Sequence, residues 1–97
     1  MALTYDESNT LRQNQTLRGR VQTACLKFAD SILGEDASVP AHNARMRWAN
    51  ECNQMPDQVT MKVVPWAVND AQVQTDGANI TDAALQVSVE TAIMKML

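Results

Sequence analysis

The sequence is poor in the residues that build most small catalytic and metal sites. Its 97 residues include two cysteines, Cys25 and Cys52, and one histidine, His42. Two cysteines are too few for a disulfide framework, and a single histidine cannot complete a four-ligand Cys/His zinc site with them. Nucleophilic catalysis needs a base beside the nucleophile, and we expect His42 to be a solvated surface residue. The sequence therefore predicts no catalytic residue, no metal and no cofactor, and we do not expect an enzyme.

Glycine and long apolar runs are also scarce. The three glycines, Gly19, Gly34 and Gly77, stand singly and far apart, so no glycine-rich phosphate loop is present. No apolar run approaches the roughly 18 residues of a membrane span. The first residues lack the basic start and apolar stretch of a signal peptide, so we expect a soluble intracellular protein without membrane contact.

What the chain does contain is enough apolar side chain for one small core. Hydrophobic residues make up 45% of the sequence, and the length suits one helical domain over residues 1–97. The net charge of −3 is unevenly distributed. Residues 1–48 carry six basic and five acidic side chains, a net +1, whereas residues 49–97 carry two and six, a net −4. The two halves therefore differ in sign.

The first part of the chain predicts a helical hairpin. Thr4 and Glu7 have the spacing of a capping box, so we expect a helix to begin at Thr4 and to end at Gly34 in a left-handed conformation. At Gly19, inside this helix, we expect a bend or a close neighbour. A second helix, beginning near Pro40, should pack antiparallel to the first and bring Cys25 and Cys52 into one core layer as small buried side chains.

The middle of the chain leaves two alternatives open. We favour a short helix over residues 56–63 and a further helical turn over residues 65–70, because Pro65 should stop or kink any helix. The alternative is a strand over residues 59–64, which are rich in β-branched side chains. Such a strand could pair only with residues 71–74, which makes it the less favoured structure.

The last helix has the clearest start. Thr81 is a good N-cap, and Ile80 and Leu85 have the spacing of a hydrophobic staple. We expect its opposite face, which includes Ser88, to be polar. The fold class is mainly α, a compact bundle of four or five helices with an N-terminal helical hairpin and a Pro-broken middle segment. The helical stripes predict these core residues: Leu17, Val21, Phe28, Ile32, Trp48, Leu85, Val89 and Ile93.

Candidate contact residues come from the basic half of the chain and from the Pro-broken segment. Trp48 lies in the centre of a helical stripe and is expected in the core, whereas Trp66 follows Pro65 and is a candidate for the surface. A surface of mixed sign suits a protein partner, and basic and acidic halves of neighbouring copies could meet head to tail. The candidate interface residues are Arg12, Arg18, Arg20, Arg45, Arg47 and Trp66.

Four segments together resemble small proteins encoded among the head and neck genes of tailed bacteriophages. They are AHNARMRWA at residues 41–49, MPD at 55–57, TDGANITD at 75–82 and LQVSVE at 85–90. The resemblance implies an all-helical virion component, of the head-to-tail joining or head-completion kind, present in many copies around a portal or capsid opening.

These observations lead to two hypotheses of function. The first is a non-catalytic structural or assembly protein of a tailed phage or prophage, which contacts portal, capsid or tail components and copies of itself. It would be assembled in the host cytoplasm and reside in the virion. The alternative is a small nucleic-acid-associated regulatory protein that uses the five arginines, although the overall acidity and the lack of a helix-turn-helix or zinc signature favour it less.

Overall fold

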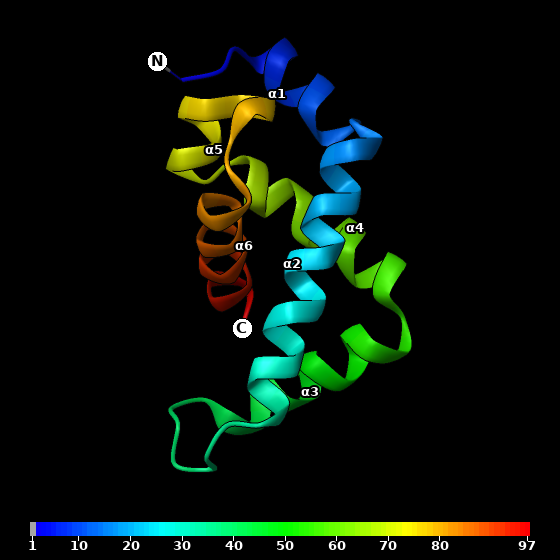
Figure 1. The fold of residues 1–97 in the computed structure, drawn as a ribbon, viewed down its shortest axis with the longest axis vertical. Helices are drawn as coiled ribbons and strands as arrows, with labels where there is room; N and C mark the ends of the chain where they lie inside the picture. The colour runs from blue at the N-terminus through cyan, green and yellow to red at the C-terminus, as the bar shows by residue number, and fades with distance from the viewer. Residues whose placement is uncertain (1) are drawn as a thin grey trace.

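Helices account for all the regular secondary structure of residues 2–97, the part of the chain that the computed structural model describes. The mainly α prediction is confirmed, with six α-helices in this range rather than four or five (Figure 1). They are α1 (Tyr5–Arg12), α2 (Gln15–Leu33), α3 (His42–Gln54), α4 (Pro56–Val68), α5 (Ala71–Asp76) and α6 (Asp82–Met96), with a short 3₁₀ helix, η1 (Gly77–Asn79), before α6.

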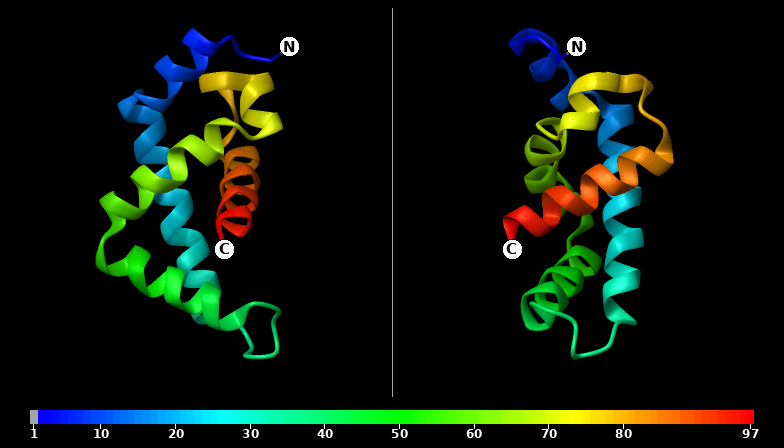
Figure 2. Two further views of the ribbon diagram at one scale, coloured as in Figure 1. Left: turned by 180° about the vertical axis from the view of Figure 1, so that it is seen from behind. Right: turned by 90° about the vertical axis from the view of Figure 1, so that its left-hand side faces the viewer.

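The long helix α2 is the element on which most of the others pack. It contacts α3, α4 and α6, and the described residues extend over 40 × 23 × 19 Å. Seen from the side in the right-hand view of Figure 2, α2 lies on one side of the molecule and α3 and α4 lie on the other, and α6 runs across in front of them from the α2 side to the α4 side. The helices α1 and α5 gather at one end, and α3 lies at the opposite end.

The first helix is interrupted where one continuous helix was expected. Thr4 and Glu7 form the predicted capping box, with hydrogen bonds of 3.0 and 3.1 Å. Asn14 then adopts an extended conformation, and its side-chain oxygen accepts a hydrogen bond of 2.9 Å from the Leu17 amide. Because this carboxamide satisfies a free N–H at the start of a new helix, α1 ends and α2 begins here. The prediction of one helix from Thr4 to Gly34 is wrong at this point.

Two expectations about glycine in α2 are also corrected. The helix passes through Gly19 without interruption, and a Cβ placed there would meet no atom within 4 Å. Neither the predicted bend nor a close neighbour is therefore found. Gly34 has a φ of −96° and is not left-handed. The left-handed residue of this connection is Ala41, with a φ of 60°, directly before α3.

The hairpin of α2 and α3 encloses the two cysteines as predicted. Cys25 and Cys52 are fully buried free thiols. Burial, together with a smaller contribution from the neighbouring Cys52, raises the pKa of Cys25 to about 12. Burial also raises the pKa of Cys52. Since the thiolate is the reactive form, both side chains serve this fold as small apolar groups.

The middle of the chain is one helix, and both expectations for it need correction. Residues 59–64 are helical rather than extended, and α4 continues through Pro65 instead of stopping there. Pro65 and Met61, four residues before it, are both exposed, so water can reach the carbonyl that loses its helical partner. The buried side chains on the other face then offset the cost of the proline: Val63, Val64, Ala67 and Val68.

The last helix and the core follow the predictions closely. Thr81 caps α6 by accepting a hydrogen bond from the Ala84 amide, and the staple residues Ile80 and Leu85 are both buried. All eight predicted core residues are buried. The opposite face of α6 is not wholly polar surface, because Ser88 is buried and donates a hydrogen bond of 2.7 Å to the Asp70 carboxylate.

Candidate protein interface

The described residues contain neither a metal cluster nor a helix long and apolar enough to cross a membrane. In residues 2–97, no three His, Cys, Asp or Glu side chains lie together in a way that could hold a metal ion. No helix in that range meets the length and hydropathy of a membrane span. The six predicted contact residues differ in how far the fold leaves them free.

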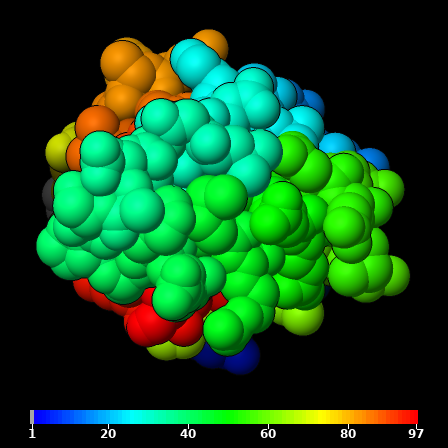
Figure 3. All heavy atoms as spheres, turned by 90° about the horizontal axis from the view of Figure 1, so that it is seen from below, coloured from blue at the N-terminus to red at the C-terminus, as the bar shows by residue number. Residues whose placement is uncertain are grey.

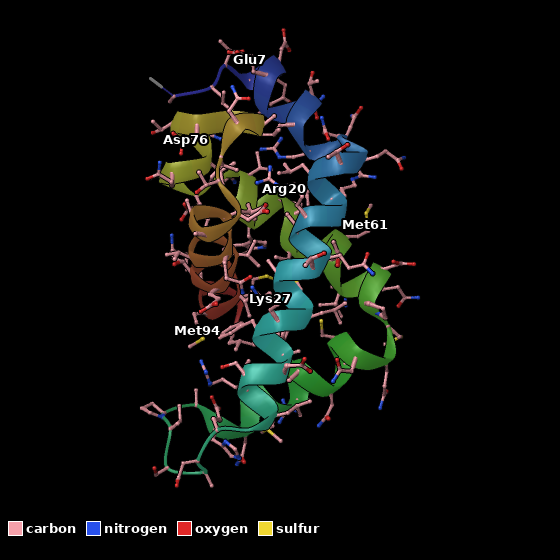
Figure 4. The ribbon with its side chains drawn as sticks, in the orientation of Figure 1. Glu7, Arg20, Lys27, Met61, Asp76 and Met94 are labelled. Atoms are coloured by element: carbon pink, nitrogen blue, oxygen red, sulfur yellow. The ribbon has the colours of Figure 1, made fainter. Side chains whose placement is uncertain are left out.

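Arg20 is committed to contacts within its own chain. Its guanidinium lies 2.8 Å from the Asp82 carboxylate and also donates hydrogen bonds to the carbonyls of Ala78 and Ile80. Figure 4 shows Arg20 on α2, close to the connection that leads into α6. The Arg20 side chain joins α2 to the start of α6 and donates hydrogen bonds to two backbone carbonyls before α6. Few of its N–H groups are therefore left to bind a partner.

Arg45 is likewise held inside the chain, at the other end of α2. Its guanidinium donates to both carboxylate oxygens of Glu35 at 2.7 to 3.1 Å and lies 5.2 Å from the ring centre of Phe28. A further hydrogen bond of 2.9 Å goes to the sulfur of Met94. The hydrogen bonds from Arg45 lower the pKa of Glu35, and those to Glu35 raise the pKa of Arg45. This ion pair closes the loop between α2 and α3.

His42, the first residue of α3, belongs to the same cluster rather than to the open surface. His42 Nδ1 lies 3.5 Å from the Glu35 carboxylate, and the His42 side chain is only 22% exposed. The expectation of a solvated histidine is therefore wrong, because the turn before α3 folds it against Glu35. Figure 3 views the molecule from this end, which the loop of residues 34–41 and α3 cover together with the C-terminal end of α6.

The other three arginines have no carboxylate partner within residues 2–97. Arg12 donates a hydrogen bond of 3.2 Å to the Asn69 side chain, and Arg18 Nε donates one of 2.8 Å to the Arg12 carbonyl. Arg47 is exposed on α3. The structure does not bring the five arginines together. Arg12 is on α1, and Arg18 and Arg20 are on the part of α2 that follows it, whereas Arg45 and Arg47 are on α3, at the opposite end of the molecule from α1 (Figure 1).

Trp66 lies on the outer face of α4. It is 48% exposed, and Met61 on the same helix is 51% exposed. Pro65, between them in sequence, is also exposed. Figure 4 shows Met61 pointing away from the bundle. We call these three residues, with Lys62, the α4 face.

Two clefts border the α4 face. One, of about 260 Å³, lies between α2 and α4 and includes Met61 in its wall. The other, of about 170 Å³, lies among α3, α4 and α6 and includes Lys62 and Trp48. The α4 face therefore lies between two clefts, into which side chains of a protein partner could insert.

Sequence reasoning missed most of this surface. Met55, Met61 and Met94 are exposed, and none of them is among the candidate interface residues predicted from the sequence. A signal was present: if a helix continues through Pro65, then Val59, Val63 and Ala67 define its buried side and leave Met61 outside. The assumption that Pro65 ends the helix hid that pattern.

The chain gives no match in comparisons with known proteins. No protein-family model, no curated protein and no solved structure is similar enough to it to be reported.

Proposed function

We propose that this protein is a non-catalytic assembly component of a tailed phage or prophage virion, and that it binds another virion protein through the α4 face. The observation that carries the proposal is the exposure of Trp66 and Met61 on one helix, outside a well-filled core. Tryptophan and methionine are enriched in protein interfaces, and tryptophan is a frequent hot-spot residue.

The α4 face is a better contact surface than the arginines. Arg20 and Arg45 are bound to Asp82 and Glu35, so a partner would have to break those ion pairs to use them. Trp66 has no such competing partner, and its burial by a second protein would remove a large apolar area from water. The resemblance supplies the class of partner: a portal, capsid or tail component in a particle assembled in the host cytoplasm.

The proposal is tested in the phage or prophage whose genome encodes the chain. The gene is deleted and complemented with the parent sequence, with Trp66→Ala, or with Tyr5→Ala as the matched control. Tyr5 is a 78% exposed aromatic residue on α1, away from the α4 face. We expect the parent and Tyr5→Ala proteins in purified particles by mass spectrometry, and Trp66→Ala protein to be absent although its melting temperature is unchanged.

Two outcomes would contradict the proposal. If the parent protein is absent from purified particles, the virion role is wrong. If Trp66→Ala is incorporated as well as Tyr5→Ala, the α4 face is not the contact surface.

A DNA titration tests the alternative, a nucleic-acid-associated regulator. A protein that neutralises several phosphates loses affinity steeply as salt rises. Arg47 is exposed and outside the ion pairs, so a regulator should lose affinity in Arg47→Ala. Tight binding with a steep salt slope that Arg47→Ala reduces would favour the regulator over the assembly protein.

A further inference from the structure

Gly19 lowers the stability of α2, and no contact within the described part of the chain explains why a glycine is present there. Glycine in the middle of a helix is less favourable than alanine, and it is usually kept where a backbone must come close to something. Here α2 is regular through Gly19, and a Cβ at this position would meet nothing within 4 Å. The space over Gly19 is therefore open, and no contact within residues 2–97 requires the missing side chain.

Gly19 lies in the cleft between α2 and α4, which we call the α2–α4 groove. The α2 wall includes Arg18, Gly19 and Gln22, and the α4 wall includes Asp57 and Met61. Each wall carries one charge of opposite sign, and neither Arg18 nor Asp57 has an ion-pair partner within residues 2–97. Arg18 uses only its Nε internally, on the Arg12 carbonyl, which leaves its terminal nitrogens for another contact.

The two walls also differ in what they present to a second molecule. The α4 wall presents a flexible side chain, Met61, that is 51% exposed, and the α2 wall presents the open space over Gly19. A two-fold axis that runs along the groove places the α2 wall of each copy against the α4 wall of the other. Met61 of each copy then faces Gly19 of its partner, and Arg18 faces Asp57, and both contacts occur twice.

We propose that the α2–α4 groove is the contact surface of a symmetric dimer of this chain, in which Met61 packs over Gly19 and Arg18 pairs with Asp57. A dimer of this kind needs only a modest share of the surface. An interface at the small end of the usual range buries roughly 600 Å² per partner. That is about a tenth of the 5724 Å² surface of the described chain. Met61 belongs both to the α4 face and to the groove, whereas Trp66, the residue changed in the virion test, lies outside the groove, so each proposal has its own test.

Sedimentation velocity of the full chain from low to high micromolar concentration tests the dimer. We expect the mass to rise from one copy to two and to stop there, with weaker association at high salt because the charge pairs are solvent-accessible. Arg18→Glu and Asp57→Lys each place like charges opposite one another twice, and each should weaken the dimer by about tenfold or more. The double variant restores opposite charges and should regain the dimer.

Two further variants complete the design. Lys27→Glu makes the same change of charge on the same helix outside the groove (Figure 4) and should dimerise as the parent does. Gly19→Leu fills the space that Met61 needs and should abolish the dimer while the helical circular dichroism is retained. If Arg18→Glu unfolds, Asp57→Lys tests the same contact from the other wall.

Three results would overturn the dimer: a monomer at every concentration, a mass that grows beyond two copies, or a double charge variant no better than the single ones. Growth beyond two copies would instead support the head-to-tail contact predicted from the charge asymmetry. The dimer and the virion role fail separately. A monomer that still enters particles overturns only the dimer, and a dimer absent from particles overturns only the virion role.

Discussion

The two ends of α2 differ in whether the arginine beside them is paired with a carboxylate. At the end that meets α3, Arg45 is enclosed by Glu35, Phe28 and Met94, and its hydrogen bonds are made within the chain. In the half that meets the start of α4, Arg18 borders an open groove and has no carboxylate partner within residues 2–97. Both arginines border a cleft, of about 510 Å³ at Arg45 and about 260 Å³ at Arg18, but only the charge of Arg45 is paired within this range. We call the end with the Arg45–Glu35 ion pair the closed end, and the charge of Arg18 is available to another molecule. The comparison teaches that a basic residue marks a binding surface only where the fold leaves its charge unpaired.

Substitutions at the two ends should therefore differ in their effect on folding free energy. Changes at the closed end should cost folding free energy, because tightly packed side chains leave cavities or unpaired groups when they are removed. Changes in the groove should be tolerated by the fold and should affect association. The four predictions below run from the largest expected effect to the smallest.

Phe28→Ala should break the closed end and cost about 3 to 5 kcal/mol of folding free energy. Phe28 is buried, and its ring lies 5.8 Å from that of Trp48 and under the Arg45 guanidinium. Urea unfolding followed by circular dichroism measures the effect. Tyr5→Ala, an exposed aromatic control, should change the stability by less than about 0.5 kcal/mol. Equal stability of the two variants would show that the packing of α2 on α3 is wrong.

Pro65→Ala should stabilise the chain by about 1 to 3 kcal/mol, because it lets the Met61 carbonyl accept the missing helical hydrogen bond. The matched control is Pro56→Ala, since Pro56 occupies the first turn of α4, where proline removes no helical bond. The midpoint of urea unfolding should rise for Pro65→Ala and stay nearly constant for Pro56→Ala. A loss of stability in Pro65→Ala would contradict a continuous α4.

Gly19→Ala should stabilise the single chain by about 0.5 to 1 kcal/mol, because its helix is regular and its Cβ would meet nothing within 4 Å. Gly77→Ala is the contrasting change. Gly77 has a φ of +59°, a conformation that strains any side chain, and Leu3 lies against it. Thermal unfolding should show opposite shifts for the two variants. A destabilised Gly19→Ala would mean that the space over Gly19 is not open.

Acid should weaken the closed end through Glu35. The hydrogen bonds from Arg45 lower the folded-state pKa of Glu35 below its ordinary value of 4.5. A lowered folded-state pKa stabilises the fold above the unfolded-state pKa, and that stability is lost as the pH falls from about 4.5 through the lowered value. Melting temperatures at pH 7 and at about pH 3 should therefore differ less in Glu35→Gln than in the parent. An identical difference would show that this ion pair does not control acid stability.

Local signals in the sequence were sufficient for much of the fold. The capping box at Thr4, the N-cap at Thr81 and the staple of Ile80 and Leu85 all depend on residues three to five positions apart. The burial of Phe28 and Trp48 followed from apolar spacing alone. Such signals need no knowledge of the rest of the chain.

The predictions that failed depend on contacts distant in the sequence. Pro65 was expected to end a helix because local rules give proline that effect, but its neighbours are buried against other helices and hold the segment helical. Among the candidate interface residues, Trp66 is placed on the surface, whereas Arg20 is held by a carboxylate 62 residues away. No spacing rule reveals such a partner.

The sequence by itself determined where most helices begin, which faces of them are apolar, and that the chain lacks a four-ligand Cys/His zinc site. These properties depend on residue type and on helical periodicity. Only the tertiary structure decided that α4 runs through Pro65, that Arg20 and Arg45 are used internally, and that Gly19 and Met61 border one groove. The physical reason is that a charge or an apolar group becomes available to a partner only after folding has satisfied or left free its contacts with the rest of the chain.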